Sequence, residues 1–192
     1  MKIFGIDPGS DRTGYGCIET DGSRHRVVLS GAISSPSATA FPEKLLRIHT
    51  RLAALILECG PDCVAIESIF FAANARSALK LGHARGVAML AAVEAGVPVV
   101  EYSPAEIKRA VVGYGRAEKH QVQQMVKLVL GLARAPSPHD VADALAVAIC
   151  HVHSTLPGVA GATSRVPRAG SSSTSKTPKA LTSWRHYRPA RP

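Results

Sequence analysis

Two acidic residues, Asp7 and Glu67, each end a short apolar stretch of the sequence. Such stretches are typical of buried strands, and a carboxylate that ends one must be paired, bound to a metal ion or exposed. Because open α/β sheets bind ligands at the carboxyl ends of their strands, both acids are candidate site residues. The alternatives are a turn-forming aspartate at position 7 and a solvated strand-end glutamate at position 67.

Asp140 and Asp143 are three residues apart at the expected start of a helix, so both project from one face of it. Helix capping would be enough to explain Asp140. Ser137 would be the N-cap and Pro138 the first helical residue, and an acid is favourable in the first turn of a helix. Capping does not explain Asp143, which lies one turn further along. His139 and Lys119 are candidates for proton transfer, but we leave His139 out of the catalytic set.

Together, the four acids predict a site for hard divalent cations, which prefer oxygen ligands. Without a cation, each pair of carboxylates about 4 Å apart would repel by roughly 4 kcal/mol at an effective dielectric near 20. Two Mg²⁺ ions, with Mn²⁺ as a substitute, would suit phosphodiester hydrolysis, because one activates water and the other stabilises the leaving oxygen. We therefore expect in-line attack on phosphorus, with the ions bridging protein and DNA backbone.

The apolar pattern predicts the elements that must position these acids. Three strands form a meander, and helices then alternate with two further strands. This order is typical of an α/β ribonuclease H-like fold, with a mixed five-stranded sheet flanked by helices. The expected strands are 2–7, 14–20, 26–30, 63–67 and 97–102, and the expected helices are 42–59, about 74–95, one opened by Ser103-Pro104, 119–132 and 139–154.

The composition of the chain predicts one folded domain and a tail. With 192 residues, 46% of them hydrophobic, the chain can bury one sizeable core. The net charge of +9 falls to +2 over residues 1–154, because residues 155–192 carry seven basic side chains and no acidic one. We expect a nuclease domain at 1–154 and a basic, Ser/Pro-rich disordered tail at 155–192.

Two further features bear on where the protein works. The chain has no leading run of 18 or more uncharged apolar residues, so we expect a cytoplasmic protein that does not enter membranes. Its four cysteines have no CxxC spacing and lie in apolar segments, as reduced core thiols do. We therefore expect no disulfide.

Several spaced motifs closely resemble the RuvC family of junction resolvases, over Met1 to about Ser154. The resemblance implies that Asp7, Glu67, Asp140 and Asp143 are catalytic metal ligands. It also implies a homodimer that nicks two symmetric strands of a four-way DNA junction in recombination and repair, together with a branch-migration helicase complex, RuvA and RuvB. The motifs are Phe4-Gly5-Ile6-Asp7-Pro8-Gly9-Ser10, Ala65-Ile66-Glu67, Ser77-Ala78-Leu79-Lys80-Leu81-Gly82, Ala117-Glu118-Lys119 and Ala142-Asp143-Ala144-Leu145-Ala146.

The resemblance also implies residues that contact DNA. Phe70 lies at the position of an aromatic that stacks on bases, although a phenylalanine here could instead pack on the following helix. Lys108 and Lys119 match basic residues near the scissile phosphate. Each basic residue could equally be a solvated surface charge. Backbone contacts are further expected from Arg76, Lys80 and Arg116.

Other functions compete with a resolvase. The Gly-Ile-Asp-Pro-Gly-Ser sequence resembles the first phosphate loop of actin-like and sugar-kinase-type ATP-binding proteins, but that fold needs a second such half and the chain has none. A non-catalytic junction-binding protein would not need four acids. A ribonuclease H-like nuclease acting on RNA hybrids would share the fold.

Overall fold

The strands form one mixed sheet with β1 at its centre. In the computed structural model, which describes residues 1–68 and 74–155, five strands lie in the order β3-β2-β1-β4-β5. β1 pairs antiparallel with β2 and parallel with β4, which confirms the predicted mixed sheet. The strands are β1 (Lys2–Asp7), β2 (Arg12–Thr20), β3 (His25–Ser34), β4 (Cys63–Glu67) and β5 (Val99–Tyr102).

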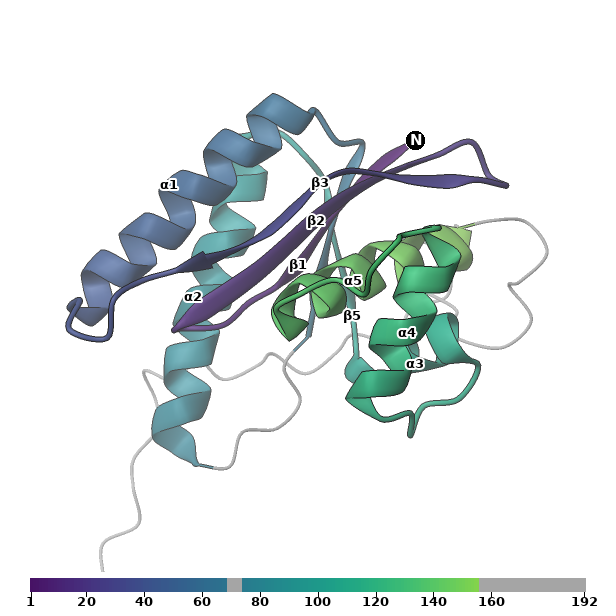
Figure 1. Cartoon of the computed structure of the whole chain (residues 1–192). Helices are drawn as coiled ribbons and strands as arrows, with labels where there is room; N and C mark the ends of the chain where they lie inside the picture. Colours follow the sequence, from purple (N-terminus) through teal and green to yellow (C-terminus); the bar gives the residue numbers. More distant parts are fainter. Residues whose placement is uncertain (69–73, 156–192) are drawn as a thin grey trace, which may run out of the picture. The chain divides into compact units, whose positions relative to one another are not determined.

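Helices cover both faces of this sheet. α1 and α2 pack side by side on one face, and α5 crosses the other face with α3 and α4 beside it (Figure 1). α1 ends at Gly60 in the left-handed conformation, φ 56°, which a glycine adopts at little cost. The helices are α1 (Phe41–Cys59), α2 (Ala75–Glu94), α3 (Pro104–Val112), α4 (Lys119–Val129) and α5 (His139–Thr155).

The β2–β3 hairpin is longer than the apolar pattern predicts. Its antiparallel ladder continues as far as the pair Arg12–Ser34, whereas the expected strands begin at Gly14 and stop at Ser30. Apart from the buried Ile33, the extra residues are small or polar, so they carry no alternating signal and their backbone pairing defines them as strand. The extension brings Arg12 into the sheet at the edge where β1 ends.

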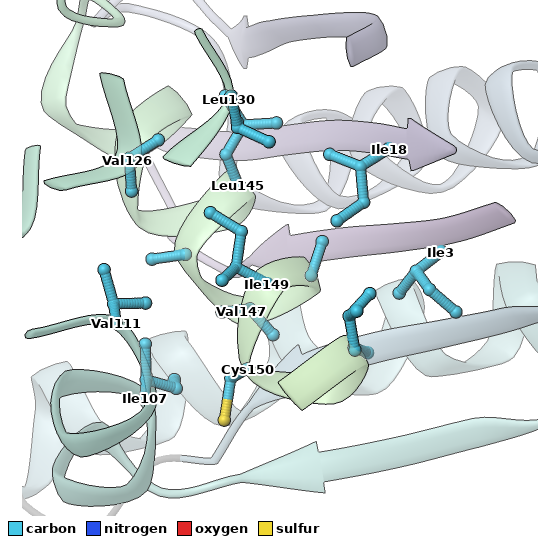
Figure 2. Packing of buried hydrophobic residues seen from close by; sticks show 14 of the residues in the cluster. Ile3, Ile18, Ile107, Val111, Val126, Leu130, Leu145, Val147, Ile149 and Cys150 are labelled. Atoms are coloured by element: carbon cyan, nitrogen blue, oxygen red, sulfur yellow. The ribbon is translucent and has the colours of Figure 1, made fainter. Parts of the chain in front are cut away.

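Alternating side chains of the strands divide the core into two clusters. Phe4 and Ile6 face α1 and α2, whereas Ile3 faces the layer of α3, α4 and α5. Figure 2 shows this second cluster, in which α5 is buried along most of its length. A helix that is apolar nearly all round belongs in an interior, and α5 is enclosed between the sheet and two other helices. The labelled residues of the cluster are Ile3, Ile18, Ile107, Val111, Val126, Leu130, Leu145, Val147, Ile149 and Cys150.

Glycines on β1 and β2 let α5 lie directly on the sheet. A Cβ atom at Gly14 would overlap the carbonyl oxygen of Asp140, and one at Gly5 would overlap that of Ala144. At Gly16 the added atom would meet the Leu145 side chain instead. Gly5 pairs with Gly16 across the two strands, so the backbone of α5 rests on a surface without side chains.

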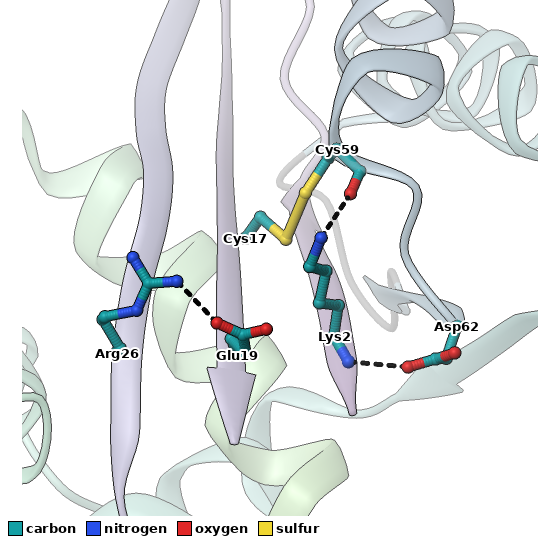
Figure 3. The surroundings of a disulfide bond; sticks show 6 residues. All are labelled: Lys2, Cys17, Glu19, Arg26, Cys59 and Asp62. Carbon is teal, nitrogen blue, oxygen red and sulfur yellow. Dashed lines mark hydrogen bonds and ion pairs between the residues drawn. A yellow bond between two sulfur atoms is a disulfide. The ribbon is translucent and has the colours of Figure 1, made fainter. Parts of the chain in front are cut away.

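Cys17 on β2 and Cys59 at the end of α1 form a disulfide, which corrects the expectation of four reduced thiols (Figure 3). Their Cα atoms are 7.3 Å apart, wider than in most disulfides. Both residues are buried where α1 packs on the sheet, and a separation of 42 residues gives no sequence signal for this meeting. Cys63 and Cys150 are free and buried.

Within residues 1–68 and 74–155, the helices are too short or too polar to cross a membrane. The predicted tail at 155–192 lies, apart from Thr155, outside the described residues.

Substituting Gly14 with alanine should destabilise the fold by about 1–3 kcal/mol, because the new methyl group collides with backbone atoms of α5 that cannot rotate away. Gly16→Ala is the matched control, since its methyl group meets only a side chain, and it should cost less. Urea unfolding followed by circular dichroism measures both. Equal stability of Gly14→Ala and the wild type would contradict close packing of α5 on β2.

Candidate active site

The strand register places Asp7 and Glu67 next to each other. β1 and β4 are parallel neighbours with Ile6 opposite Ile66, so the following residue of each strand is an acid. Side chains alternate along a strand, and Ile3 and Ala65 belong to the cluster on the α5 side. Asp7 and Glu67 therefore also face α5, at the carboxyl ends of their strands.

The first turns of α5 bring the other two acids to the same edge. Asp140 is the second residue of the helix, and its backbone lies on Gly14, the residue of β2 that pairs with Asp7. Asp143 follows one turn later. The helix begins at His139, so Pro138 lies just before the first helical position, which the sequence predicts it to occupy. The Ser137-Pro138 peptide bond is cis.

Three of the four acids line one pocket of about 220 Å³, which also contains two lysines. Lys108 comes from α3 and Lys119 from the start of α4, so both predicted phosphate-contacting residues lie where the acids meet. Apolar side chains of α3 and α4 close the remaining wall. The lining residues are Asp7, Glu67, Pro104, Ile107, Lys108, Lys119, Val122 and Asp143.

The acids perturb one another strongly. Burial, followed by the negative charges of Glu67 and Asp143, raises the pKa of Asp7 to about 8. A proton that the two carboxyl groups can share further raises the pKa of Asp7 and acts to lower that of Glu67. Burial also raises the pKa of Glu67 and of Asp143, while the positive charge of Lys119 lowers both. The site therefore holds more negative charge than its own lysines neutralise.

In the described part of the chain, no three His, Cys, Asp or Glu side chains are already arranged to hold a metal ion. The four carboxylates have other partners instead. Asp7 and Glu67 lie together in the pocket, Asp140 accepts a hydrogen bond from Arg12 at 3.3 Å, and Asp143 lies 4.0 Å from the Lys119 Nζ. Arg12 has no place in the sequence-predicted site, because the residue lies ahead of the strand that the apolar pattern indicates.

The chemistry of this donor set nevertheless fits a hard divalent cation. All four candidate ligands are carboxylates. Burial, and after it the neighbouring negative charges, raises the pKa of Asp7, Glu67 and Asp143, and a bound cation would favour their charged forms.

The other predicted contact residues lie outside the pocket lining. Arg76 is exposed in the first turn of α2, and Arg116 is exposed in the segment between α3 and α4. Lys80 is also exposed, with its Nζ 5.8 Å from the centre of the Phe41 ring. Phe70 lies outside the described residues, so its role stays a prediction.

Comparisons with known proteins agree on one family. Residues 3–151 match the family model described as crossover junction endodeoxyribonuclease RuvC. A protein of that name from Alkaliphilus oremlandii is 54% identical over 153 residues, which cover 80% of this chain and 93% of the relative.

Solved structures give the same result. A Thermus thermophilus RuvC structure is 38% identical with a TM-score of 0.73, and the match covers 79% of this chain and 93% of that one. T. thermophilus RuvC in complex with a Holliday junction substrate is 34% identical with a TM-score of 0.76, and the match covers 83% of this chain and 98% of that one. These matches confirm the predicted fold class.

The raised pKa of Asp7 predicts how stability depends on pH without metal. An acid whose pKa is higher in the folded state than in the unfolded state favours folding at low pH, and this contribution is lost as the pH rises from about 4 to about 8. Asp7→Asn removes that dependence. We expect that, in EDTA, raising the pH from 5 to 9 lowers the unfolding free energy of the wild type more than that of Asp7→Asn. The difference should be at least about 1.4 kcal/mol, the equivalent of one pKa unit. Urea titrations at pH 5, 7 and 9 measure the difference, and parallel pH profiles would refute it.

Proposed function

This chain belongs to the RuvC family of crossover junction endodeoxyribonucleases, and from that membership we propose how its acid pocket resolves Holliday junctions. The observation that carries the proposal is the meeting of Asp7 and Glu67, at the ends of adjacent parallel strands, with acids from α5. Family membership also decides against an ATP-binding protein of the sugar-kinase type, because the match spans nearly all of the described residues.

We assign the catalytic and metal-binding roles to Asp7, Glu67, Asp140 and Asp143. When bound, two Mg²⁺ ions, or Mn²⁺ in their place, would supply the positive charge that activates a water molecule and stabilises the leaving oxygen. The carboxylates at the ends of β1, β4 and α5 would hold those ions. The half-buried positions of Asp7 and Glu67 limit access of bulk water, which strengthens the electrostatic interactions in the pocket.

Lys108 and Lys119 are the groups that we expect to contact the DNA phosphate. Both line the pocket, and the Lys119 side chain is largely exposed, so its ammonium group is accessible to a backbone that approaches from solvent. These positive charges offset the repulsion between the acids and the phosphate. Lys119 is also close enough to the acids to serve as a proton donor or acceptor, the role for which His139 is the alternative.

The remaining DNA contacts extend the surface beyond the pocket. Arg76, Lys80 and Arg116 are exposed and would bind the backbone of the junction arms. Phe70 would stack on a base at the branch point, where base pairs open most readily. Stacking at an open branch point accounts for selectivity by shape, because a linear duplex offers no such opening.

The outer face of α2 is the surface through which we expect two copies to pair. Leu79 and Val93 are largely exposed there and Leu90 is half exposed. An apolar groove around Gly82 and Gly86 has room for the side chains of another helix. A symmetric pair of pockets suits a four-way junction, whose two cleaved strands are related by approximate two-fold symmetry. The resulting homodimer would work in the cytoplasm with a branch-migration helicase complex, RuvA and RuvB.

Asp7→Asn and Asp143→Asn should each abolish nicking of a synthetic four-way junction in Mg²⁺ while leaving junction binding within about threefold of the wild type, because the acids hold the ions and the lysines hold the DNA. Removing the metal with EDTA should have the same effect on cleavage. Gel assays with a labelled junction, a linear duplex and an RNA hybrid measure activity and selectivity together. Persistent cleavage by either variant would reject the assigned acids.

Leu79→Glu should weaken the homodimer at least about tenfold, because it places a charge in an apolar interface. Leu128→Glu on α4 is the matched control, since Leu128 is equally exposed, at 69% against 64%. Sedimentation velocity over a concentration series gives the association constants. If the two variants behave alike, α2 is not the dimer surface.

A further inference from the structure

The one arginine that touches the candidate acids in the described structure is Arg12, at the start of β2. Its Nη1 donates a hydrogen bond to the Asp140 Oδ2 at 3.3 Å. About half of the Arg12 side chain is exposed, whereas the Asp140 side chain is 29% exposed. A pair as open to solvent as this contributes little to folding stability, so stability alone does not account for it.

The backbone around Arg12 is fixed on both sides. The buried Thr13 hydroxyl donates to the Gly9 carbonyl oxygen at 2.8 Å and closes the turn between β1 and β2. Asp11, the acid next to Arg12, is held by the Lys44 ammonium group of α1 at 2.7 Å. Asp11 is thus paired with Lys44, and the guanidinium of Arg12 pairs with Asp140.

Arg12 and a divalent ion cannot both be close to Asp140 at low cost. An ion bound to the Asp140 carboxylate would repel the guanidinium of Arg12. The Arg12 side chain could then rotate into solvent, because half of it is already exposed. A DNA phosphate that enters with the ion has the opposite charge, and the planar fork of an arginine matches phosphate geometry.

We infer that Arg12 is a positioning residue that holds Asp140 while no metal is bound and moves to the DNA backbone when a divalent ion replaces it. This inference rests on the proposed junction-cleaving function and adds a residue to it. Arg12 thereby keeps Asp140 at the site and limits the negative charge that faces incoming DNA. Lys119 likewise forms an ion pair with Asp143, but at the longer distance of 4.0 Å.

The test uses full-length Arg12→Met and Arg12→Lys, with Arg26→Met as the matched control. Arg26 is also paired with an exposed acid, Glu19, but at the opposite end of the β2–β3 hairpin. The first measurement is binding of Ca²⁺ alone by calorimetry, without DNA. Arg12→Met should bind Ca²⁺ about threefold to tenfold more tightly than the control, because the competing cation is gone.

The second measurement is fluorescence anisotropy of a labelled four-way junction in Ca²⁺, with strand integrity checked on denaturing gels. Arg12→Met should bind about threefold to tenfold more weakly than Arg26→Met, with a salt dependence reduced by about one ion. Arg12→Lys should lie between the two, since it keeps the charge and loses the planar fork.

Either of two results would overturn the inference and leave the proposed function intact. The first is a Ca²⁺ affinity of Arg12→Met equal to or below that of Arg26→Met. The second is that Arg12→Met and Arg26→Met bind the junction with equal affinity and equal salt dependence. A purely structural ion pair would produce both of these together with a lower unfolding temperature. A wild type that binds the junction no better than a linear duplex would instead reject the proposed function, and the inference with it.

Discussion

The close contact between α5 and the bare backbone of β1 and β2 is the constraint on which the site depends. Side chains at Gly5 or Gly14 would push the helix away from the sheet, and its acids would move with it. The distance between helix and sheet thus sets the distance between carboxylates that come from opposite ends of the sequence. A site assembled in this way needs rigid elements, and the burial of α5 among the sheet, α3 and α4 supplies that rigidity.

Such a site carries an electrostatic cost that the fold has to support. Burial and neighbouring charges raise the pKa of Asp7, and cations at the border of the cluster hold two of the other acids. The hydrophobic clusters on both faces of the sheet stabilise the chain against this repulsion. Function and stability therefore make opposite demands on the same few residues. On the proposed assignment, a divalent ion would reconcile these demands only while it is bound.

Much of the fold, and the places of the four acids at strand ends and a helix start, could be predicted from the sequence, because such element ends carry strong local signals. Asp7 and Glu67 follow apolar runs, and Asp143 has no role in capping. Other features depend on contacts between distant segments. Arg12 belongs to a stretch of β2 that only pairing with β3 defines, and Cys17 meets Cys59 only because α1 packs on the sheet. Gly5, Gly14 and Gly16 can be read in the sequence, but no local signal indicates that a helix packs on them.

The turn that joins β2 to β3 lies at the other end of the sheet from the acids, because β2 begins beside Asp7 and ends at Thr20. It maintains its own shape: the Asp21 carboxylate accepts hydrogen bonds from the backbone of Ser23 and Arg24. A loop that is exposed, closed by its own contacts and remote from the chemistry tolerates insertion well. It is thus a natural position for a fluorophore, from which single enzyme molecules could be followed as they engage and release branched DNA.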